Sequence, residues 1–306
     1  MSGSSFSFLL IGAGRGGTSL LAGLLDSHSQ LEIGFELFSI DYLIGRKMPW
    51  CSRNKKERLI HDRVQAFRNA CLQESLKFSG KLWGNKITSE QINGLEDHNR
   101  LNPGAKLDIL DYFFRESLTG LKIVFILRDG RTCVRSKVSR TGQSLELACE
   151  RWKFSVRVYQ YLMQRHPNMI AVKYEDLLRE PAGELSKLCE FLGVSFEPTM
   201  LGGTNNPKMI PEYRHHSLLK AKLDQPLEHE AWHSLIAQEL SECGYILRTL
   251  CWRGHRRSKH PAHSFGALNC KPPRPSCCWF SAKSTFVKKQ RFRAEVLPAS
   301  RHRVVA

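Results

Sequence analysis

The stretch "FSFLLIGAGRGGTSLLAGLLDS", residues 6–27, decides the fold of this chain. Its apolar run from Phe6 to Ile11 predicts a buried strand, the glycines predict a turn, and Thr18 to Leu25 begins an amphipathic helix. A glycine-rich turn between a strand and a helix presents backbone N–H groups and the positive end of the helix dipole to an anion. The stretch therefore predicts an anion-binding loop, and the chemistry of that anion decides the function.

The rest of the chain alternates between the same two kinds of element. Buried strands are predicted in the runs at 29–40, 121–140 and 168–178, and the second of these continues into a polar turn and a helix. Because strands and helices alternate, we expect an α/β protein with a P-loop-like three-layer fold, in which helices flank a central, mainly parallel sheet. The remaining segments predicted as helical are 46–86, 108–118, 145–165, 183–194 and 229–245.

The positive charge of the chain is concentrated at one end. The 306 residues have a formal net charge of +17, and residues 249–306 contain 13 lysines and arginines against one acid, Glu295. This segment also clusters proline, serine and cysteine without a sustained apolar period, which is typical of a disordered tail. We therefore expect a folded domain over 1–248 and a basic, disordered tail over 249–306. The alternative role for the tail is an electrostatic arm for nucleic acid or an anionic membrane.

Targeting signals are not evident in the sequence. No apolar run approaches the roughly 20 residues that span a bilayer, and the N-terminus enters its first strand without a basic leader or a cleavage site. We therefore expect a cytoplasmic protein. The ten cysteines form no C-x-x-C pair, which predicts reduced thiols, and the Cys and His residues of the tail match no zinc-binding spacing. No metal is expected.

One interpretation of the glycine-rich loop is a dinucleotide-binding fingerprint. Gly12, Gly14 and Gly17 spell G-x-G-x-x-G, and Glu36 lies 19 residues beyond, near the position of an acid that binds ribose. Against this interpretation, nicotinamide binding offers no role for the loop at 128–140, which is rich in arginine and serine.

A second interpretation is the phosphate loop of a kinase or NTPase. Gly12 and Gly17 are spaced as in G-x-x-x-x-G-K-[ST], and Ser19 stands where a hydroxyl would bind Mg²⁺. However, Thr18 takes the place of the lysine, and the nearest cation is Arg15, inside the loop. A loop without that lysine is poorly equipped to neutralise a transferring γ-phosphate and its metal.

A third interpretation starts from the cation that is present. The sequence R-G-G-T-S, residues 15–19, offers a guanidinium, backbone N–H groups and two hydroxyls, which suit a phosphate attached to a sulfonate. The stretch at 12–36 resembles the 5′-phosphosulfate loop, usually R-S-G-T-[ST], of sulfotransferases that use 3′-phosphoadenosine 5′-phosphosulfate (PAPS). The stretch "ILRDGRTCVRSKVSR" resembles their 3′-phosphate loop, whose Arg and Ser eight residues apart are matched by Arg128 and Ser136. The resemblance extends from Phe6 to Tyr245, and it is greatest to tyrosylprotein sulfotransferases and their bacterial relatives.

The resemblance implies three catalytic residues. In the relatives a glutamate 21 residues after the loop arginine is the general base, and Glu36 keeps this spacing from Arg15. A positioned carboxylate can accept the proton that a hydroxyl loses when it attacks sulfur. Lys86 is similar to the family lysine that reaches the bridging oxygen as the sulfonate departs, although Ile87 and Thr88 follow it where the family often has K-[TD]-P. Arg15 would share in stabilising the developing charge.

The resemblance also implies two groups of PAPS-binding residues. Ala231 stands where the tyrosylprotein enzymes have a lysine before a tryptophan, so one phosphate contact is expected to be missing. Gly16 stands where the family has a serine, which removes a hydroxyl but leaves the backbone N–H. The match of Ser217 needs a one-residue gap, whereas Lys222 keeps its distance to Trp232. The residues expected at the 5′-phosphosulfate are Arg15, Gly16, Gly17, Thr18 and Ser19. Those expected at the 3′-phosphate are Arg128, Ser136, Arg140, Tyr174, Ser217 and Lys222.

The predicted function is transfer of a sulfonate group from PAPS to an acceptor hydroxyl, of a protein tyrosine or a carbohydrate, without a metal. The alternatives are a nucleotide-dependent kinase and a nucleotide-binding protein without turnover. Residues 46–86 hold 11 lysines and arginines against three acids. They form either a solvated helical face or a surface that attracts an acidic peptide or glycan. The sequence does not predict the oligomeric state.

Overall fold

The computed structural model describes residues 6–48, 56–208 and 230–245. The predicted tail at 249–306, with its boundary at residue 248, lies outside the described residues, as do Ser217 and Lys222. The division into a folded domain and a disordered tail therefore stays a prediction.

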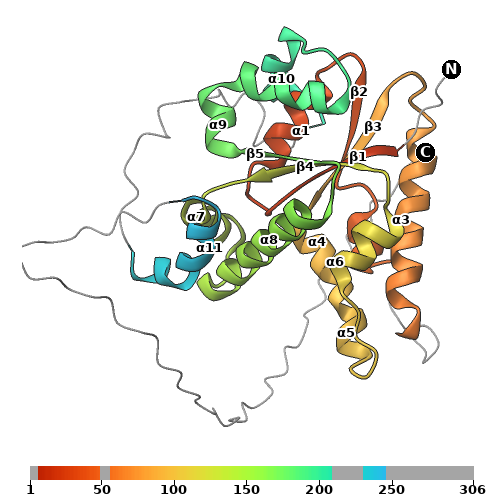
Figure 1. Ribbon diagram of the computed structural model, residues 1–306, viewed down its shortest axis with the longest axis vertical. Coiled ribbons are helices and arrows are strands. Elements are labelled where there is room, and N and C mark those ends of the chain that lie inside the picture. Colours follow the sequence, from red (N-terminus) through yellow and green to blue (C-terminus); the bar gives the residue numbers. More distant parts are fainter. Residues whose placement is uncertain (1–5, 49–55, 209–229, 246–306) are drawn as a thin grey trace, which may run out of the picture. The chain divides into compact units, whose positions relative to one another are not determined.

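A single parallel sheet of five strands forms the centre of the described chain (Figure 1). Its order is β2-β3-β1-β4-β5, and every neighbouring pair is parallel. The strands are β1 (Phe6–Gly12), β2 (Leu31–Phe35), β3 (Leu82–Thr88), β4 (Lys122–Leu127) and β5 (Met169–Lys173). The parallel sheet predicted from the sequence is confirmed, and it aligns the carboxyl ends of all five strands along one edge.

Helices cover both faces of the sheet, because successive residues of each buried strand point to opposite faces. Leu9 and Ile11 of β1 pack in one core with α3 (Leu59–Ser75) and α8 (Leu145–Arg165). Phe8 and Leu10 pack in a second core with α1 (Thr18–Asp26) and α10 (Pro181–Leu192). Figure 1 shows α1 and α10 on one side of the strands and α3 and α8 on the other. The predicted three-layer α/β fold is confirmed.

Shorter helices connect these layers. The predicted turn and helix after β4 are confirmed as α7, and the predicted helix over 183–194 ends as expected at Gly193, which has a left-handed backbone with φ 89°. The other α-helices are α4 (Ser89–Asn93), α5 (Asp97–Leu101), α6 (Ile109–Asp111), α7 (Gly130–Thr141), α9 (Tyr174–Arg179) and α11 (Ala237–Glu242). Shorter 3₁₀ turns are Gly94–Glu96, Pro198–Asn205 and Ala231–Ile236, and π-helical turns are Ser39–Leu43 and Tyr112–Ser117.

Two predictions about secondary structure are wrong in part. The segment 46–86 was expected to be helical and contains α3, but it ends in the central strand β3. Gly84, Asn85 and Lys86 interrupt the apolar run of this strand, so its sequence lacks the pattern of a buried strand although all three residues are buried. The single helix expected over 229–245 is instead a 3₁₀ turn followed by the short helix α11.

The strand order also bears on the dinucleotide interpretation of the glycine loop. In the dinucleotide-binding fold β2 pairs directly with β1, so that an acid after β2 reaches a ribose bound at the first loop. Here β3 lies between β1 and β2, and Glu36, which follows β2, contacts Lys86 of β3. The order therefore argues against a ribose-binding role for Glu36.

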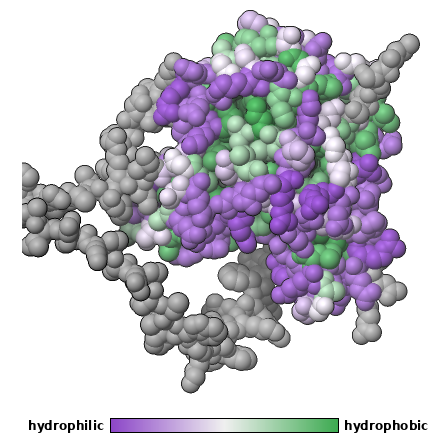
Figure 2. All heavy atoms as spheres, in the orientation of Figure 1, coloured by the Kyte–Doolittle hydropathy of each residue, from purple (hydrophilic) through white to green (hydrophobic). Residues whose placement is uncertain are grey.

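The surface seen from the side of Figure 1 is mostly hydrophilic, with apolar residues in several patches among the polar ones (Figure 2). In the ranges that the structure describes, none of the helices combines the length and the apolar character that a membrane crossing requires.

The contact between β1 and β3 generates a stability prediction. A Cβ atom added at Gly84 would lie 2.3 Å from two ring carbons of Phe8, its partner across the two strands. Both residues are buried, so we expect Gly84→Ala to lower the free energy of unfolding by about 1–3 kcal/mol. Gly104→Ala is the control, because a Cβ there would meet no atom within 4 Å. Urea unfolding of both variants measures the difference, and equal stabilities would contradict the packing described here.

Candidate active site

The predicted site residues follow the carboxyl ends of the strands. The glycine loop follows β1, Glu36 follows β2, Lys86 lies near the end of β3, Arg128 follows β4, and Tyr174 follows β5. In open α/β sheets ligands bind outside this edge. The topology therefore brings five segments that are far apart in the sequence to one side of the sheet.

The glycine loop is shaped to receive an anion. The Gly16 N–H donates to the Ala13 carbonyl over 2.8 Å, and both Arg15 and Gly17 have a left-handed backbone. Gly17 precedes the first turn of α1, where, within the described residues, no side chain caps the helix and no acid is present. The N–H groups at a helix N-terminus lack partners inside the helix, so those of Thr18 and Ser19 are suited to an anion.

The loop after β4 lies directly against the glycine loop. Arg128 Nη1 donates to the Arg15 carbonyl over 2.9 Å, and Arg15 Nε donates to Ser136 Oγ over 3.3 Å. The Arg128 guanidinium lies over the ring of Tyr174, 4.4 Å from its centre. These contacts bring together residues predicted for the 5′-phosphosulfate and for the 3′-phosphate.

Gly17 and Arg140 are two further predicted residues of these loops. A Cβ at Gly17 would lie 2.4 Å from Tyr174 Cδ2, so only glycine lets the tyrosine ring approach the loop. Arg140 is exposed in the last turn of α7. It lies on the same face of this helix as Ser136, which precedes it by one turn.

The predicted base and the predicted lysine are in direct contact. Lys86 Nζ lies 2.5 Å from Glu36 Oε1, and the Glu36 N–H donates to the Lys86 carbonyl over 2.7 Å. The Lys86 side chain is 4% exposed, whereas that of Glu36 is 32% exposed. A buried ammonium group is thus neutralised by a carboxylate that solvent can reach.

Backbone strain is concentrated at these same positions. Among the described residues other than glycine, only Arg15, Glu36 and Phe38 have a positive φ, of 71°, 59° and 65°. Such conformations are unfavourable for residues with a Cβ, and they cluster where a function requires a fixed geometry. Two of the three are the predicted cation and the predicted base.

Sequence reasoning missed an ion pair behind the glycine loop. The carboxylate of Glu90 accepts hydrogen bonds from the Gly14 N–H at 2.9 and 3.1 Å and pairs with Lys137 of α7, whose side chain is 3% exposed. Glu90 and Lys137 are 47 residues apart, and no spacing in the sequence indicates that they meet. The pair links α4, the glycine loop and α7.

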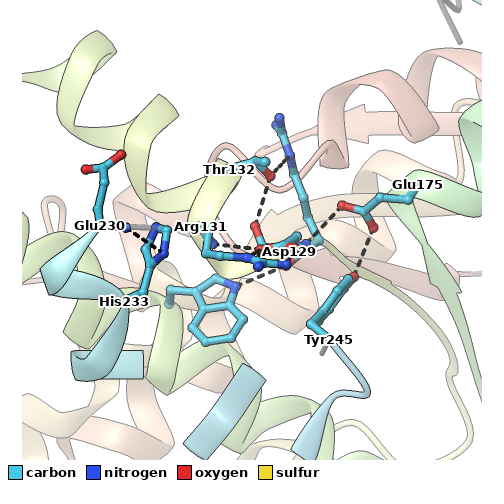
Figure 3. Close-up of polar contacts among 9 residues, drawn as sticks. Asp129, Arg131, Thr132, Glu175, Glu230, His233 and Tyr245 are labelled. Carbon is cyan, nitrogen blue, oxygen red and sulfur yellow. Dashed lines mark hydrogen bonds and ion pairs between the residues drawn. The ribbon is translucent and has the colours of Figure 1, made fainter. Parts of the chain in front are cut away.

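A second network fixes the loop that carries Arg128 (Figure 3). Asp129 caps α7 by accepting from the Arg131 N–H and guanidinium, and its own N–H donates to Glu175 Oε1 over 3.0 Å. The Tyr245 hydroxyl donates to Glu175 Oε2 over 2.9 Å. Burial raises the pKa of the Glu175 carboxyl above its usual value. The hydrogen bond from Arg131 to Asp129 raises the pKa of that guanidinium, so the arginine stays charged.

The segment after residue 229 packs beside α7. Glu230 pairs with Arg135 and accepts from Trp232 Nε1. The Glu230 N–H donates to His233 Nδ1 (Figure 3). This segment contains the tryptophan from which the positions of Ser217 and Lys222 were predicted.

The described part of the chain offers no cluster of three or more His, Cys, Asp or Glu residues that could hold a metal ion. Its cysteines, Cys71, Cys133, Cys149, Cys189 and Cys243, are buried free thiols.

The Glu90–Lys137 pair leads to a prediction about stability. Lys137→Met removes the charge that neutralises Glu90 and leaves a largely buried carboxylate beside the glycine loop. Breaking a buried pair in this way costs about 3–5 kcal/mol of unfolding free energy. Adding Glu90→Gln should recover part of the loss, because an amide oxygen still accepts the Gly14 N–H without a charge. Urea unfolding of the two single variants and the double variant gives the coupling energy, and strictly additive losses would contradict the pairing.

Comparisons with known proteins show which sequences and folds this chain resembles. A model of the sulfotransferase family matches residues 113–198, the part from the π-helical turn before β4 to the start of the 3₁₀ turn Pro198–Asn205. Protein-tyrosine sulfotransferase A of Caenorhabditis elegans is 26% identical over 211 residues, which cover 63% of this chain and 52% of that protein. Protein-tyrosine sulfotransferase 1 of Danio rerio is 24% identical over 205 residues, covering 62% and 54%. The chain thus spans about half the length of the curated relatives it matches.

Solved structures share the fold. The sulfotransferase domain of the Synechococcus PCC 7002 olefin synthase superposes with a TM-score of 0.55 at 17% identity, covering 79% of this chain and 95% of that one. The sulfotransferase domain from the curacin biosynthetic pathway gives a TM-score of 0.51 at 17% identity, with 79% and 99% covered. The resemblance to the sulfotransferase family, predicted from the two loops of the sequence, is therefore confirmed in sequence and in fold.

Proposed function

We propose that this protein is an enzyme that transfers a sulfonate group from PAPS to an acceptor hydroxyl, with protein tyrosine as the first acceptor class. One observation supports this function best: the two predicted nucleotide loops are joined by Arg15, Ser136 and Arg128, and the Glu36–Lys86 pair lies at the same edge of the sheet. The curated relatives named above are protein-tyrosine sulfotransferases.

The two loops divide the nucleotide between them in this proposal. The N-terminus of α1 with Thr18 and Ser19, together with Gly16, Gly17 and Arg15, binds the 5′-phosphosulfate through backbone N–H groups, hydroxyls and a guanidinium. A second set of residues binds the 3′-phosphate, since the paired donors of an arginine suit the paired oxygens of a phosphate. Tyr174 borders this second site. The set consists of Arg128, Ser136 and Arg140, with Ser217 and Lys222 as further predicted members.

The reaction needs one base and one group that stabilises the leaving phosphate. The acceptor oxygen attacks the sulfur, its proton passes to the Glu36 carboxylate, and the bond between sulfur and the bridging oxygen breaks. The released product is adenosine 3′,5′-bisphosphate. Lys86 and Arg15 stabilise the charge that develops on the bridging and phosphate oxygens. Before the reaction, the short contact with Lys86 holds the Glu36 side chain at the edge of the sheet.

Part of the positive charge on which the acidic-acceptor hypothesis rests is neutralised by nearby acids. Arg46 and Lys47 both pair with Asp41, and Arg58 pairs with Asp62. Such pairs reduce the positive electrostatic potential that would attract an anionic partner. An acidic peptide or glycan as acceptor therefore stays a prediction, and a hydroxyl acceptor is the broader proposal.

The kinase alternative is not favoured by the loop geometry. Thr18, which occupies the place of the P-loop lysine, is only 4% exposed. The glycine loop contains no lysine, and Arg15 is the cation that the loop itself supplies. A nucleotide-binding protein without turnover would have no evident use for an exposed carboxylate held by a buried lysine.

The proposed 3′-phosphate site predicts a difference between two ligands. Arg128→Ala should weaken the binding of adenosine 3′,5′-bisphosphate by about 1.5–3 kcal/mol, the usual value of a charge-assisted hydrogen bond, and affect adenosine 5′-monophosphate much less. The ratio of the two Kd values cancels any general disturbance of the loop, including the lost bond to the Arg15 carbonyl. Calorimetric titration measures both, and Arg68→Ala, on the exposed face of α3, is the control. Equal losses for both ligands would remove Arg128 from this role.

The proposed base predicts a separation of chemistry from binding. Glu36→Gln keeps the size of the side chain and an oxygen for Lys86, but it cannot take a proton. We expect kcat to fall by about 10²–10⁴-fold, the usual contribution of a general base, with little change in affinity for adenosine 3′,5′-bisphosphate. Glu190→Gln, on the exposed face of α10, is the matched control. Weakened nucleotide binding with normal turnover would instead assign Glu36 to the nucleotide.

A further inference from the structure

The buried side-chain amide of Gln91 contacts the proposed base, Glu36. Gln91, in the short helix α4 that follows β3, is 4% exposed, and its Nε2 donates to Glu36 Oε2 over 2.7 Å. Lys86 Nζ contacts the other carboxylate oxygen. Both oxygens of Glu36 are therefore engaged, one by a charged donor and one by a neutral donor.

The orientation of the Gln91 amide is fixed by a second contact. Its Oε1 accepts the Thr88 N–H over 2.8 Å, at the start of α4. A backbone N–H can only donate, so the amide oxygen must face Thr88 and the NH₂ group must face Glu36. An amide NH₂ can only donate as well, so the oxygen of Glu36 that it meets must accept. The direction of this hydrogen bond, from Gln91 to Glu36, is therefore fixed.

The charged groups around this contact come from two elements. Lys86 of β3 faces Glu36 directly. Glu90, the neighbour of Gln91 in α4, turns instead to the Gly14 N–H and to Lys137 of α7. Consecutive residues of α4 therefore contact two different parts of the site. Glu90 contacts the glycine loop, and Gln91 contacts the proposed base.

Resting on the proposed role of Glu36 as general base, we propose that Gln91 is a positioning residue that holds the Glu36 carboxylate in the orientation in which it accepts a proton. Gln91 acts through Glu36 and needs no contact with either substrate. It directs one lone pair of Glu36 Oε2 toward the protein interior, so that the remaining lone pairs are those available to an acceptor hydroxyl. The left-handed backbone of Glu36, with φ 59°, is compatible with such an imposed orientation.

Two substitutions separate positioning from folding. Gln91→Glu preserves the shape and the oxygen that accepts the Thr88 N–H, so the start of α4 is retained, but it replaces the donor that faces Glu36 by a second carboxylate. Two carboxylates at this distance share a proton, and one of them then ionises only at higher pH. Gln91→Leu removes the donor without adding a charge. Gln73→Glu, on the exposed face of α3, makes the same chemical change away from the site and is the control.

The experiment measures the pH profile of kcat/KM for sulfonate transfer in these variants and the affinity for adenosine 3′,5′-bisphosphate. For Gln91→Glu we expect the acidic limb of the profile to move to higher pH by about one unit or more. For Gln91→Leu we expect kcat to fall roughly tenfold or more, as for the loss of a hydrogen bond to a charged group. Nucleotide affinity should change less than twofold in both, and Gln73→Glu should match the unmodified protein.

A titration by NMR with ¹³C-labelled glutamate carboxyl groups, assigned by comparison with Glu36→Gln, tests the inference without turnover. The midpoint of Glu36 should move to higher pH in Gln91→Leu, because the carboxylate loses a hydrogen-bond donor, and stay in place in Gln73→Glu. An unmoved midpoint would overturn the positioning role, whatever the activity. If the midpoint moves but the unmodified protein transfers no sulfonate to any acceptor, the contact with Gln91 stands and the proposed function fails. If turnover is present and neither the midpoint nor the acidic limb moves, the function stands and the role of Gln91 is overturned.

Discussion

The ammonium group of Lys86 is buried near the end of a central strand, and the rest of the site depends on how that charge is balanced. A buried cation without a partner is strongly unfavourable, so the fold must bring a carboxylate to it. Glu36 meets this requirement because β2 lies beside β3, and because its left-handed backbone turns the chain directly after the strand. Gln91 then holds the second oxygen of the same carboxylate.

Direct hydrogen bonds join the two predicted nucleotide loops. Arg128 bonds the backbone of Arg15, and Arg15 reaches Ser136, so each loop is fixed by the other before any ligand binds. The Glu90–Lys137 pair and the Asp129–Glu175–Tyr245 network support these loops from behind. Such preorganisation is what electrostatic stabilisation of a transferring group requires, because little reorganisation is then needed during the reaction.

Much of this arrangement could be predicted from the sequence, and the reasons are local. The apolar run and the glycines at 6–17 predict β1 and its loop. The resemblance to the family identified Glu36, Arg128 and Ser136, which the structure places at the carboxyl edge of the sheet. Strand β3 was missed because Gly84, Asn85 and Lys86 do not form an apolar pattern, although Lys86 itself was identified. Glu90, Gln91 and Lys137 could not be found, since their partners are distant in sequence and are set only by the tertiary structure.

Transfer of labelled sulfonate tests the central claim most directly. The full chain would be incubated with ³⁵S-labelled PAPS and a tyrosine-containing peptide in the presence of EDTA, beside the same peptide with phenylalanine in place of tyrosine. The account predicts label on the tyrosine peptide alone, one adenosine 3′,5′-bisphosphate released for each sulfonate transferred, and no loss of rate on chelation. Tight binding of the nucleotide without transfer to tyrosine or to any other hydroxyl acceptor, or a transfer that stops when Mg²⁺ is removed, would contradict it.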